Sequence, residues 1–312
     1  MDHTASVTSD SKPDAVSHKR RRCGQLTSAE IIQAIEKLQK RCIIKFTESH
    51  IHIICNHDAS EGGVQVWSQV KVQSLFSDYR IQSNSNNEIT ILISPEALLL
   101  ALRSAWNPAS LDSTPETVMK LAKKNDQAVL SFDISGSMSS GRMVRVGHDV
   151  RIEVMKPSDV QKLTEPMCPE PDVHILLPPL QKLRTIVERL RPLSDIIAVR
   201  CNNNGKLQIS VQTEGVSVDT QWSGCMNPKM AQEGASQNPD ADGDVERPDP
   251  DHLFSVLISI KSFIKFLNSH VLSSTTIACI CQGHCVILYV YIGDVADAGG
   301  VLTFYIPAHI DS

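Results

Sequence analysis

Apolar residues recur at helical spacing between residues 179 and 191, near the middle of the chain. Every third or fourth residue there is apolar, which predicts a helix that buries one face, and basic residues occupy the rest of its surface. After Pro192, three short stretches ending at Trp222 alternate apolar and polar residues, as half-buried strands joined by tight turns do. Residues 178–222 therefore predict a helix followed by three antiparallel strands.

The same plan occurs once earlier in the chain. Residues 28–41 repeat the helical pattern, and residues 42–47 and 51–55 predict two strands around a turn at 48–50. Residues 62–70 predict the third strand. The chain therefore contains two copies of one helix-and-strand unit.

A second element of the repeat is a strand that runs directly into a helix, at residues 91–102 and again at 256–267. Ser94 and Ser259 are suited to cap the amino ends of these two helices, because a serine hydroxyl accepts a hydrogen bond from the backbone of the first turn. Pro95 falls at the first helical position, where its missing N–H costs nothing. We therefore expect helices to begin at both places.

The offset between the copies grows from 152 positions, for Ile35 and Val187, to 165 positions, for Ile93 and Ile258. Residues 223–250, rich in glycine, proline and acidic side chains, supply the insertion that this change requires. Repeats of solenoid proteins have periods of roughly 20 to 50 residues, so a repeat of this length is a duplicated domain.

The expected architecture is α+β, with two tandem domains whose strands form antiparallel sheets. We assign a disordered polar tail to residues 1–24, the first domain to 25–154, a proline-rich connector to 155–171 and the second domain to 172–312. Within the second domain, residues 223–250 are expected to be a flexible acidic insertion.

Composition is that of a soluble globular protein: 312 residues, 41% of them hydrophobic, are enough for two ordinary domains. Nine scattered cysteines, an odd number, with no secretory signal before them, favour a reducing compartment. The longest apolar run, at residues 286–292, is too short to span a bilayer, and no membrane partner is expected.

Basic residues 19–22 end the polar tail. They are consistent with a nuclear import signal, and equally with an ordinary solvated run of charge, since four basic residues are a weak signal.

Two clusters resemble metal sites, and the spacing argues against both. Asp240, Asp242 and Asp244 alternate like the start of a calcium loop, but the glycine stands at the fourth position instead of the sixth. Residues 279–285 hold three cysteines and a histidine, which on composition alone favours zinc. The glutamine and glycine among them mark the turn of a hairpin between apolar strands, so we interpret the cysteines as small buried apolar residues. No metal or cofactor is expected.

No catalytic motif is recognisable. Residues 135–141 are rich in glycine and serine, but no Gly-Lys-Ser/Thr follows them, and we interpret them as a connection between two strands. The chain has neither a G-x-S-x-G elbow nor a G-x-G-x-x-G dinucleotide motif, and His57 and His148 are not accompanied by a nucleophile in a recognisable setting. This favours a binding or scaffold role over an enzyme.

Charge separates the helices from the rest of the chain. The expected helices, at 28–41, 94–106, 179–192 and 259–269, hold ten basic and four acidic residues, a net charge of +6, whereas the chain has a net charge of −5. Positive helices on an acidic body are typical of a protein that presents one face to a polyanion, although solvated helices produce the same pattern.

Several short motifs resemble one known family over residues 25–310. They are Gly62-Gly-Val-Gln-Val-Trp67, Asn86-Asn-Glu-Ile89, Ser137-Met-Ser-Ser140 with Arg142 and His148-Asp149, Pro169-Glu-Pro-Asp-Val173 with Leu177-Pro178, and Phe304-Tyr-Ile-Pro-Ala308. In one register they resemble the HUS-type (hydroxyurea-sensitivity) subunit of the heterotrimeric nine-one-one checkpoint clamp, a Rad-family DNA sliding clamp. Proliferating-cell nuclear antigen shares the architecture but lacks these motifs.

The resemblance implies two sliding-clamp domains, with helices on the inner wall of a ring and antiparallel sheets on the outer wall. It implies a non-enzymatic ring subunit that encircles DNA at damage or stalled forks and serves as a platform for checkpoint signalling and repair. The implied partners are two Rad-family sister subunits, a clamp loader, repair and checkpoint client proteins docking near the connector, and duplex DNA bound without sequence specificity. The implied location is the nucleus. A self-trimerising replication processivity clamp is the alternative from the same architecture.

The resemblance also implies where this chain meets DNA and its neighbours. The expected DNA-facing residues are Lys37, Lys40, Arg41, Arg103, Lys182, Arg184, Arg189, Arg191, Lys261 and Lys265. The expected subunit-interface residues, on edge strands at 142–154 and 215–222, are Arg142, Val144, Val146, Val150, Ile152, Val216, Val218 and Trp222.

One feature departs from the family. Such clamps begin with a short strand at the initiator methionine, and here polar residues stand in its place. Either the first strand is absent or the start of this chain does not match the native one.

Overall fold

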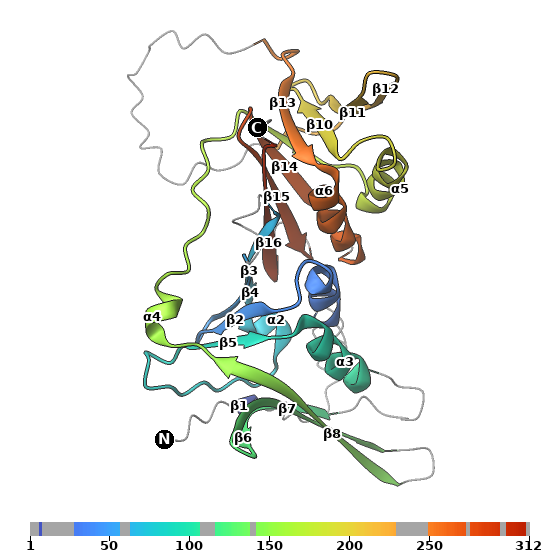
Figure 1. Ribbon diagram of the computed structural model, residues 1–312. Coiled ribbons are helices and arrows are strands. Elements are labelled where there is room, and N and C mark those ends of the chain that lie inside the picture. Colours follow the sequence, from blue (N-terminus) through green and yellow to red (C-terminus); the bar gives the residue numbers. More distant parts are fainter. Residues whose placement is uncertain are drawn as a thin grey trace.

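The chain folds as two similar domains, one after the other, joined by an extended connector (Figure 1). The computed structural model describes residues 6–7, 28–56, 63–106, 116–137, 142–228, 249–272, 275–293 and 298–309. The elements of the first domain are β1 (Ser6–Val7), a helix at 28–36, β2 (Cys42–Phe46), β3 (His50–Cys55), β4 (Gln65–Lys71), α2 (Val72–Leu75), β5 (Ile89–Ile93), α3 (Pro95–Trp106), β6 (Glu116–Lys124), β7 (Gln127–Ser137) and β8 (Met143–Val154). The connector holds α4 (Pro157–Val160). The elements of the second domain are β9 (Val173–Leu176), α5 (Leu180–Leu190), β10 (Ile196–Cys201), β11 (Leu207–Gln212), β12 (Ser217–Trp222), β13 (Phe254–Ser259), α6 (Ile260–Leu267), η3 (Asn268–Val271), β14 (Thr276–Cys281), β15 (Cys285–Ile292) and β16 (Gly300–Pro307).

The strands form two sheets, and the larger one crosses the domain boundary. Its 12 strands run in the order β1-β6-β7-β8-β5-β2-β3-β4-β16-β15-β14-β9, and the other four strands run β12-β11-β10-β13. All the neighbouring strands are antiparallel. This confirms the expected α+β class with antiparallel sheets.

Each ladder of the first domain has a counterpart in the second. The pairs β1·β6, β2·β3, β2·β5, β3·β4, β6·β7 and β7·β8 correspond to β9·β14, β10·β11, β10·β13, β11·β12, β14·β15 and β15·β16. The ladder between β5 and β8 is matched by a single bond, from the backbone N of His309 to the carbonyl of Leu257 in β13 (2.7 Å). The repeat read from the sequence is therefore a repeat of the whole strand topology.

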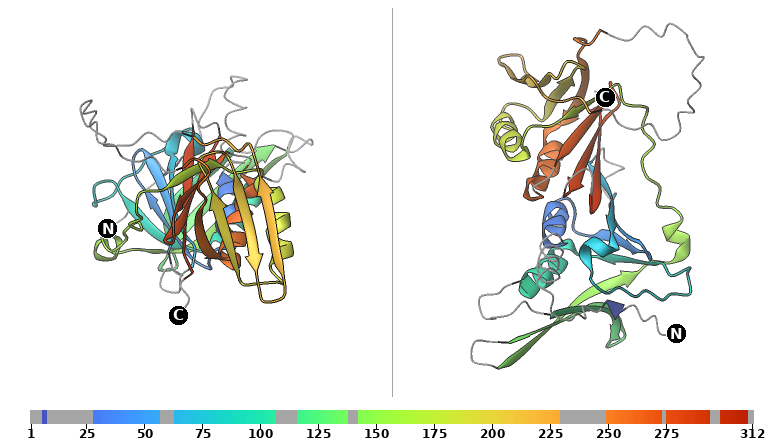
Figure 2. Two further views of the ribbon diagram at one scale, coloured as in Figure 1. Left: turned by 90° about the horizontal axis from the view of Figure 1, so that it is seen from above. Right: turned by 180° about the vertical axis from the view of Figure 1, so that it is seen from behind.

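The four longer helices lie along one side of the molecule, with strands behind them (Figure 2). The expected serine caps are present: Ser94 Oγ accepts from the backbone N of Ala97 at 3.3 Å, and Ser259 Oγ accepts from that of Ser262 at 3.5 Å. Helix α5 buries Leu183 and Val187 completely, so its apolar stripe packs on the sheet as the sequence pattern predicts. Among the described residues no helix is long and apolar enough to cross a membrane.

The structure differs from the sequence prediction at two segments. The first helix ends at residue 36 and not at 41, because the backbone N of Leu38 bonds to the carbonyl of Ile35 (3.0 Å) in a tighter turn that leads into β2. The connector begins with one helical turn, α4, whose first residue is Pro157. Proline is favoured there because its fixed φ suits the first position of a helix.

A strand does stand where the family's first strand is expected. Ser6 lies opposite Lys120 and Val7 opposite Met119, so β1 pairs with β6 as β9 pairs with β14. The other residues of the predicted tail lie outside the described residues, as do the aspartates of the calcium-like pattern before residue 249. The edge of the first domain's sheet is therefore occupied for two residues.

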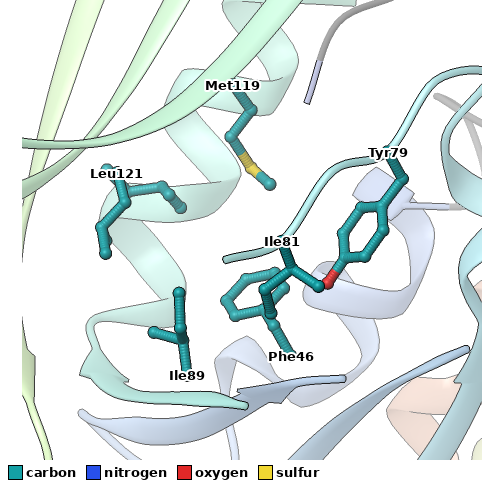
Figure 3. A pocket seen from close by; sticks show the side chains of 7 residues that line it. Phe46, Tyr79, Ile81, Ile89, Met119 and Leu121 are labelled. Carbon is teal, nitrogen blue, oxygen red and sulfur yellow. The ribbon is translucent and has the colours of Figure 1, made fainter. Parts of the chain in front are cut away.

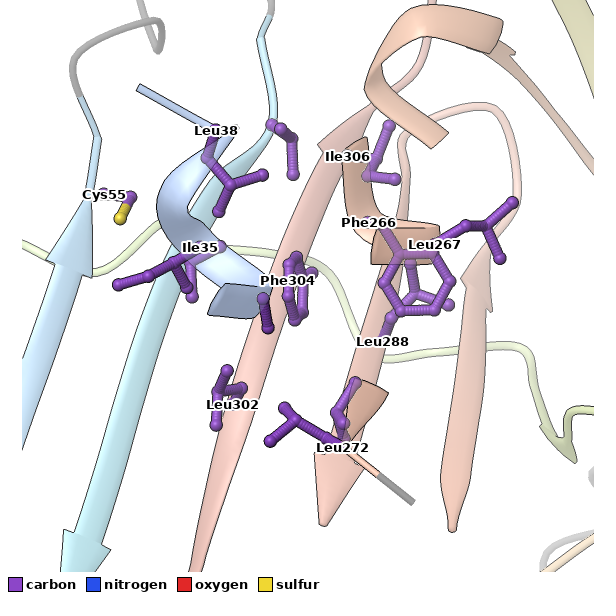
Figure 4. Close-up of a cluster of buried hydrophobic side chains, with 14 of the residues drawn as sticks. Ile35, Leu38, Cys55, Phe266, Leu267, Leu272, Leu288, Leu302, Phe304 and Ile306 are labelled. Carbon is purple, nitrogen blue, oxygen red and sulfur yellow. The ribbon is translucent and has the colours of Figure 1, made fainter. Parts of the chain in front are cut away.

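The two domains share one core where they join. Strand β4 pairs with β16 over six residues, with Val66 opposite Phe304 and Val70 opposite Gly300. Phe304 is fully buried and packs edge-to-face on Phe266, with ring centroids 5.2 Å apart. Ile35 of the first helix lies beside Phe304 (Figure 4). The approach of the strands is so close that a Cβ on Gly300 would lie 2.7 Å from the carbonyl oxygen of Gln69.

Candidate subunit and DNA interfaces

The basic residues expected to face DNA divide into paired and unpaired groups. Arg41 pairs with Glu153 at 2.8 Å, Arg184 with Glu188 at 2.8 Å, and Lys261 with Asp195 at 3.3 Å. Lys265 is half-buried in α6. The members that are exposed and make no ion pair with any described residue are Lys37, Lys40, Arg103, Lys182, Arg189 and Arg191. Lys37, Lys40 and Arg41 lie in the turn after the first helix and not on it.

Strand β12 has an open edge. It is the outermost strand of the smaller sheet. At the turn before it, the backbone N of Thr213 donates to the carbonyl of Val216 (2.9 Å), so these two residues are a hydrogen-bonded pair. Because such pairs alternate along an antiparallel ladder, Ser217, Asp219 and Gln221 direct their backbone groups away from β11, towards the open edge. These groups are free to pair with a further strand.

The first nine residues of β8 form a second open edge. Residues 143–151 pair with β7 on one side, whereas β5 pairs with β8 only from Ile152 onward. The backbone N of Met155 bonds to the carbonyl of Thr90 (2.9 Å), so by alternation the odd-numbered residues from 143 to 151 direct their backbone groups away from β7. A row of backbone donors and acceptors is thereby left for another strand.

The edges at β9 and β13 are covered by the chain itself. Beside β9, the backbone N of Leu176 donates to the carbonyl of Met226 (2.8 Å), and Asn227 Nδ2 donates to the carbonyl of His174 (2.7 Å). Beside β13, the backbone N of Gly283 donates to the carbonyl of Ser255 (3.1 Å). Unpaired edges invite association with other chains, so the open edges of β8 and β12 are candidate interfaces.

The pairing of β4 with β16, here called the internal joint, is an example of two such edges in contact. By strand order β12 is the counterpart of β4, and β8 is the counterpart of β16. Ile93 and Ile258 are matched by the repeat. Tracing the strand pairings from these two residues, in the same way in each domain, shows which residues of β4 and β12, and of β16 and β8, are equivalent. The equivalent pairs are Val66 with Val218, Val70 with Trp222, Leu302 with Val146, and Phe304 with His148. The pair β4·β16 therefore models a contact between β12 of one subunit and β8 of another.

Residues that are buried where the two domains join have equivalents at the open edges that are partly exposed. Val66, Val70 and Leu302 are 0% exposed at the joint, whereas Val218 and Trp222 are half-buried and Val146 is 38% exposed. The same holds for the helices: Ala34 is fully buried, and its counterpart Ile186 on α5 is half-buried. Ile186 was not among the predicted interface residues. Aligning the two copies of the sequence pairs it with Ala34, so the sequence alone could have identified it as a candidate interface residue.

The other predicted interface residues lie in several settings. Arg142 is exposed, Val144 is half-buried, and Val216 is 44% exposed in the turn before β12. Val150 is 5% exposed and belongs to the first domain's own core, and Ile152 packs against that core. These last two residues hold β8 in place and do not offer side chains to a neighbour.

Three cysteines of the second domain, Cys279, Cys281 and Cys285, lie in a predicted hairpin, which is confirmed as β14 and β15. Cys279, Cys281 and Cys285 are buried on the outer face of the sheet, and the half-buried Cys168 of the connector packs against them. Burial raises the pKa of the Cys279 thiol to about 12, which disfavours the thiolate that a metal needs. His174 Nδ1 lies 3.0 Å from Cys279 Sγ, but the described residues contain no group of three or more potential ligands able to hold a metal ion.

A small apolar cavity of about 20 Å³ lies in the first domain (Figure 3). It is lined by Phe46, Tyr79, Ile81, Ile89, Met119, Leu121 and Leu130. Tyr79 places its hydroxyl on the carbonyl of Thr47 at 2.9 Å, so the one polar group is already satisfied. A space of this size holds about one water molecule and has no place for a substrate or cofactor.

Comparison with known proteins decides the family. Residues 20–310 match the model of a family described as "Hus1-like protein". The chain belongs to this family. Its relative in Schizosaccharomyces pombe, "Checkpoint protein hus1", is 33% identical over 289 residues, which cover 91% of this chain and 96% of that protein. "Checkpoint protein HUS1" of Homo sapiens is 29% identical over 252 residues, 80% of this chain and 84% of the human protein.

Solved structures agree on the fold. The crystal structure of the proliferating cellular nuclear antigen of Entamoeba histolytica matches with a TM-score of 0.65 over 99% of both chains, at 13% sequence identity. At that identity the likeness shows the sliding-clamp fold alone. The expected pair of tandem clamp domains and the expected family are both confirmed.

Proposed function

We propose that the chain is a non-enzymatic subunit of a heterotrimeric ring clamp that encircles DNA at damage or stalled forks. The main support for this proposal is that one strand pairing, β4·β16, has no counterpart within the chain. Every ladder within a domain has a counterpart, which for β5·β8 is one hydrogen bond, and the ladder β4·β16 that joins the domains has its counterpart divided between the open edges of β12 and β8. Head-to-tail pairing of these edges among three related subunits closes a ring.

The family supports different sister subunits as the neighbours. The chain matches proteins named as checkpoint proteins over most of its length. This supports a heterotrimer with two Rad-family sister subunits over a self-trimerising replication clamp. Such a ring stays on DNA because it is closed around it, so it needs neither catalysis nor recognition of bases.

Contacts with DNA in this proposal come from the helix side of the molecule. Lys182 and Arg189 are exposed on α5, and Arg191 follows it directly. Basic side chains there meet phosphates without sequence preference and allow the ring to slide. The expected residues that already pair within the chain, Arg41, Arg184 and Lys261, contribute less, because their charge is partly neutralised.

Replacing Lys182 and Arg189 together by alanine is expected to weaken DNA binding by the assembled ring. Each lost phosphate contact lowers the slope of log K against log salt by about 0.9, so the double variant should lower it by about 1.8. A salt titration of ring binding to duplex DNA measures this. The control replaces Arg80 and Lys123, which are exposed outside the four longer helices, and should leave the slope unchanged. An unchanged slope in the test variant would mean that α5 does not contact DNA.

The remaining parts of the proposal concern what the ring does. A dedicated clamp loader places it on DNA in the nucleus, and its outer surface serves as a platform for checkpoint and repair proteins. The connector suits client docking because it is attached to the sheet at separate points: Tyr305 donates to Glu165 Oε1 at 2.6 Å, and Cys281 Sγ donates to the carbonyl of Pro169 at 3.4 Å.

Light scattering tests the proposal. The chain is expected to be a monomer alone and to form a one-to-one-to-one ring when co-expressed with two sister clamp subunits of its own organism. A stable homotrimer would support the replication-clamp alternative instead. A chain that stays monomeric with every sister subunit would exclude the ring.

A further inference from the structure

The two open edges carry unbalanced charges of opposite sign. On the β8 edge, Asp149 pairs with Lys124 at 2.8 Å, and Arg145 pairs with Asp133 at 3.1 Å. Glu153, beyond the open part, pairs with Arg41 at 2.8 Å. Arg142 and Arg151 are exposed and make no ion pair with any described residue. The β8 edge is therefore left with two positive charges.

The β12 edge has the opposite balance. Residues 213–222, which form β12 and the turn before it, contain two acidic residues and no lysine or arginine. Glu214 and Asp219 are both exposed, and neither forms an ion pair with the residues that the structure describes. Asp219 only accepts a bond from the neutral amide of Gln208 (2.9 Å). Two negative charges remain on this edge.

The internal joint has no such charges. Strand β4 contains one charged residue, Lys71, and β16 contains none. These strands always meet each other because they belong to one chain, so apolar packing is sufficient. The edges of β8 and β12 have no fixed neighbour, and they are the ones that carry charge.

We infer that charge on these edges selects which sister subunit sits at each side: the neighbour on β8 presents an acidic pairing strand, and the neighbour on β12 presents a basic one. This rests on the proposed ring. Exposed ion pairs add little affinity by themselves, but complementary charge speeds encounter, and like charges placed against each other repel. A subunit whose pairing strand carries the same sign as the edge that it meets is disfavoured, so the two charges restrict which subunit can sit at each side.

The test measures pairwise binding of this chain to each sister subunit, with two charge-reversal variants. R142E/R151E is expected to weaken binding of one sister subunit at least about 10-fold and to leave the other unchanged, and E214K/D219K is expected to do the reverse. Both effects should shrink when salt is raised from about 0.05 M to about 0.5 M, because ions screen exposed charges. The matched control for R142E/R151E is R80E/K162E, which makes the same change in net charge at sites away from both edges.

The outcomes separate this inference from the proposed function. If the unmodified chain forms the ring and neither reversal changes pairwise binding beyond the control, selection by charge is wrong while the ring stands. If both reversals weaken the same sister subunit, the assignment of the edges is wrong. If the unmodified chain binds neither sister subunit, the proposed function itself fails.

Discussion

Replacing Val146 by aspartate is expected to prevent the neighbour on β8 from binding while leaving the isolated chain folded. Val146 is 38% exposed in the chain alone, so a charged side chain there remains in water and costs little. Its counterpart Leu302 is 0% exposed inside the internal joint. Closing the ring would bury the aspartate in the same way, and an unpaired charge in an apolar contact is strongly unfavourable.

The expected loss is at least about 100-fold in affinity, which corresponds to about 2.7 kcal/mol. Pairwise binding to the sister subunits and the mass of the co-expressed complex both measure it. Val154→Asp is the matched control, since Val154 is a similarly exposed valine (44%) on the same strand, but its edge is already paired with Ile91 of β5. If the Val146 variant assembled like the unmodified chain, β8 would not be a subunit interface.

Phe304→Ala is expected to destabilise the chain by about 3 to 5 kcal/mol, the usual cost of removing a buried phenylalanine. Phe304 is completely buried, lies opposite Val66 of the other domain and stacks edge-to-face on Phe266. The cavity would open in the core that both domains share. We therefore expect a loss of stability in both domains and not in the second domain alone.

Urea unfolding, followed together with hydrogen exchange in each domain, measures this effect. The control is Val301→Ala on the same strand, where the side chain is only half-buried and faces away from the shared core, and it should cost much less. Exchange that rose in the second domain alone would mean that the domains unfold independently and that the joint is weaker than its burial implies.

Local features of this chain were predictable because short-range physics controls them. The caps at Ser94 and Ser259, the apolar stripe of α5 and the hairpin of β14 and β15 depend on residues a few positions apart, and all are present in the structure. The end of the first helix was predicted five residues too late. Its pattern of apolar and basic residues continues past residue 36, and nothing in that pattern reveals the tighter turn at Leu38.

The sequence by itself determined the domain duplication, the α+β class and the family, because repeats, periodicity and short motifs are properties of the order of residues. Only the tertiary structure decided which edges stay open, since that depends on strands far apart in the chain: β16 closes on β4, whereas β12 and residues 143–151 of β8 each have one edge that pairs with no described strand. It also separated paired from unpaired charges, as for Arg41 with Glu153, 112 residues away. Long-range pairing arises from packing of the whole chain, and no local pattern contains it.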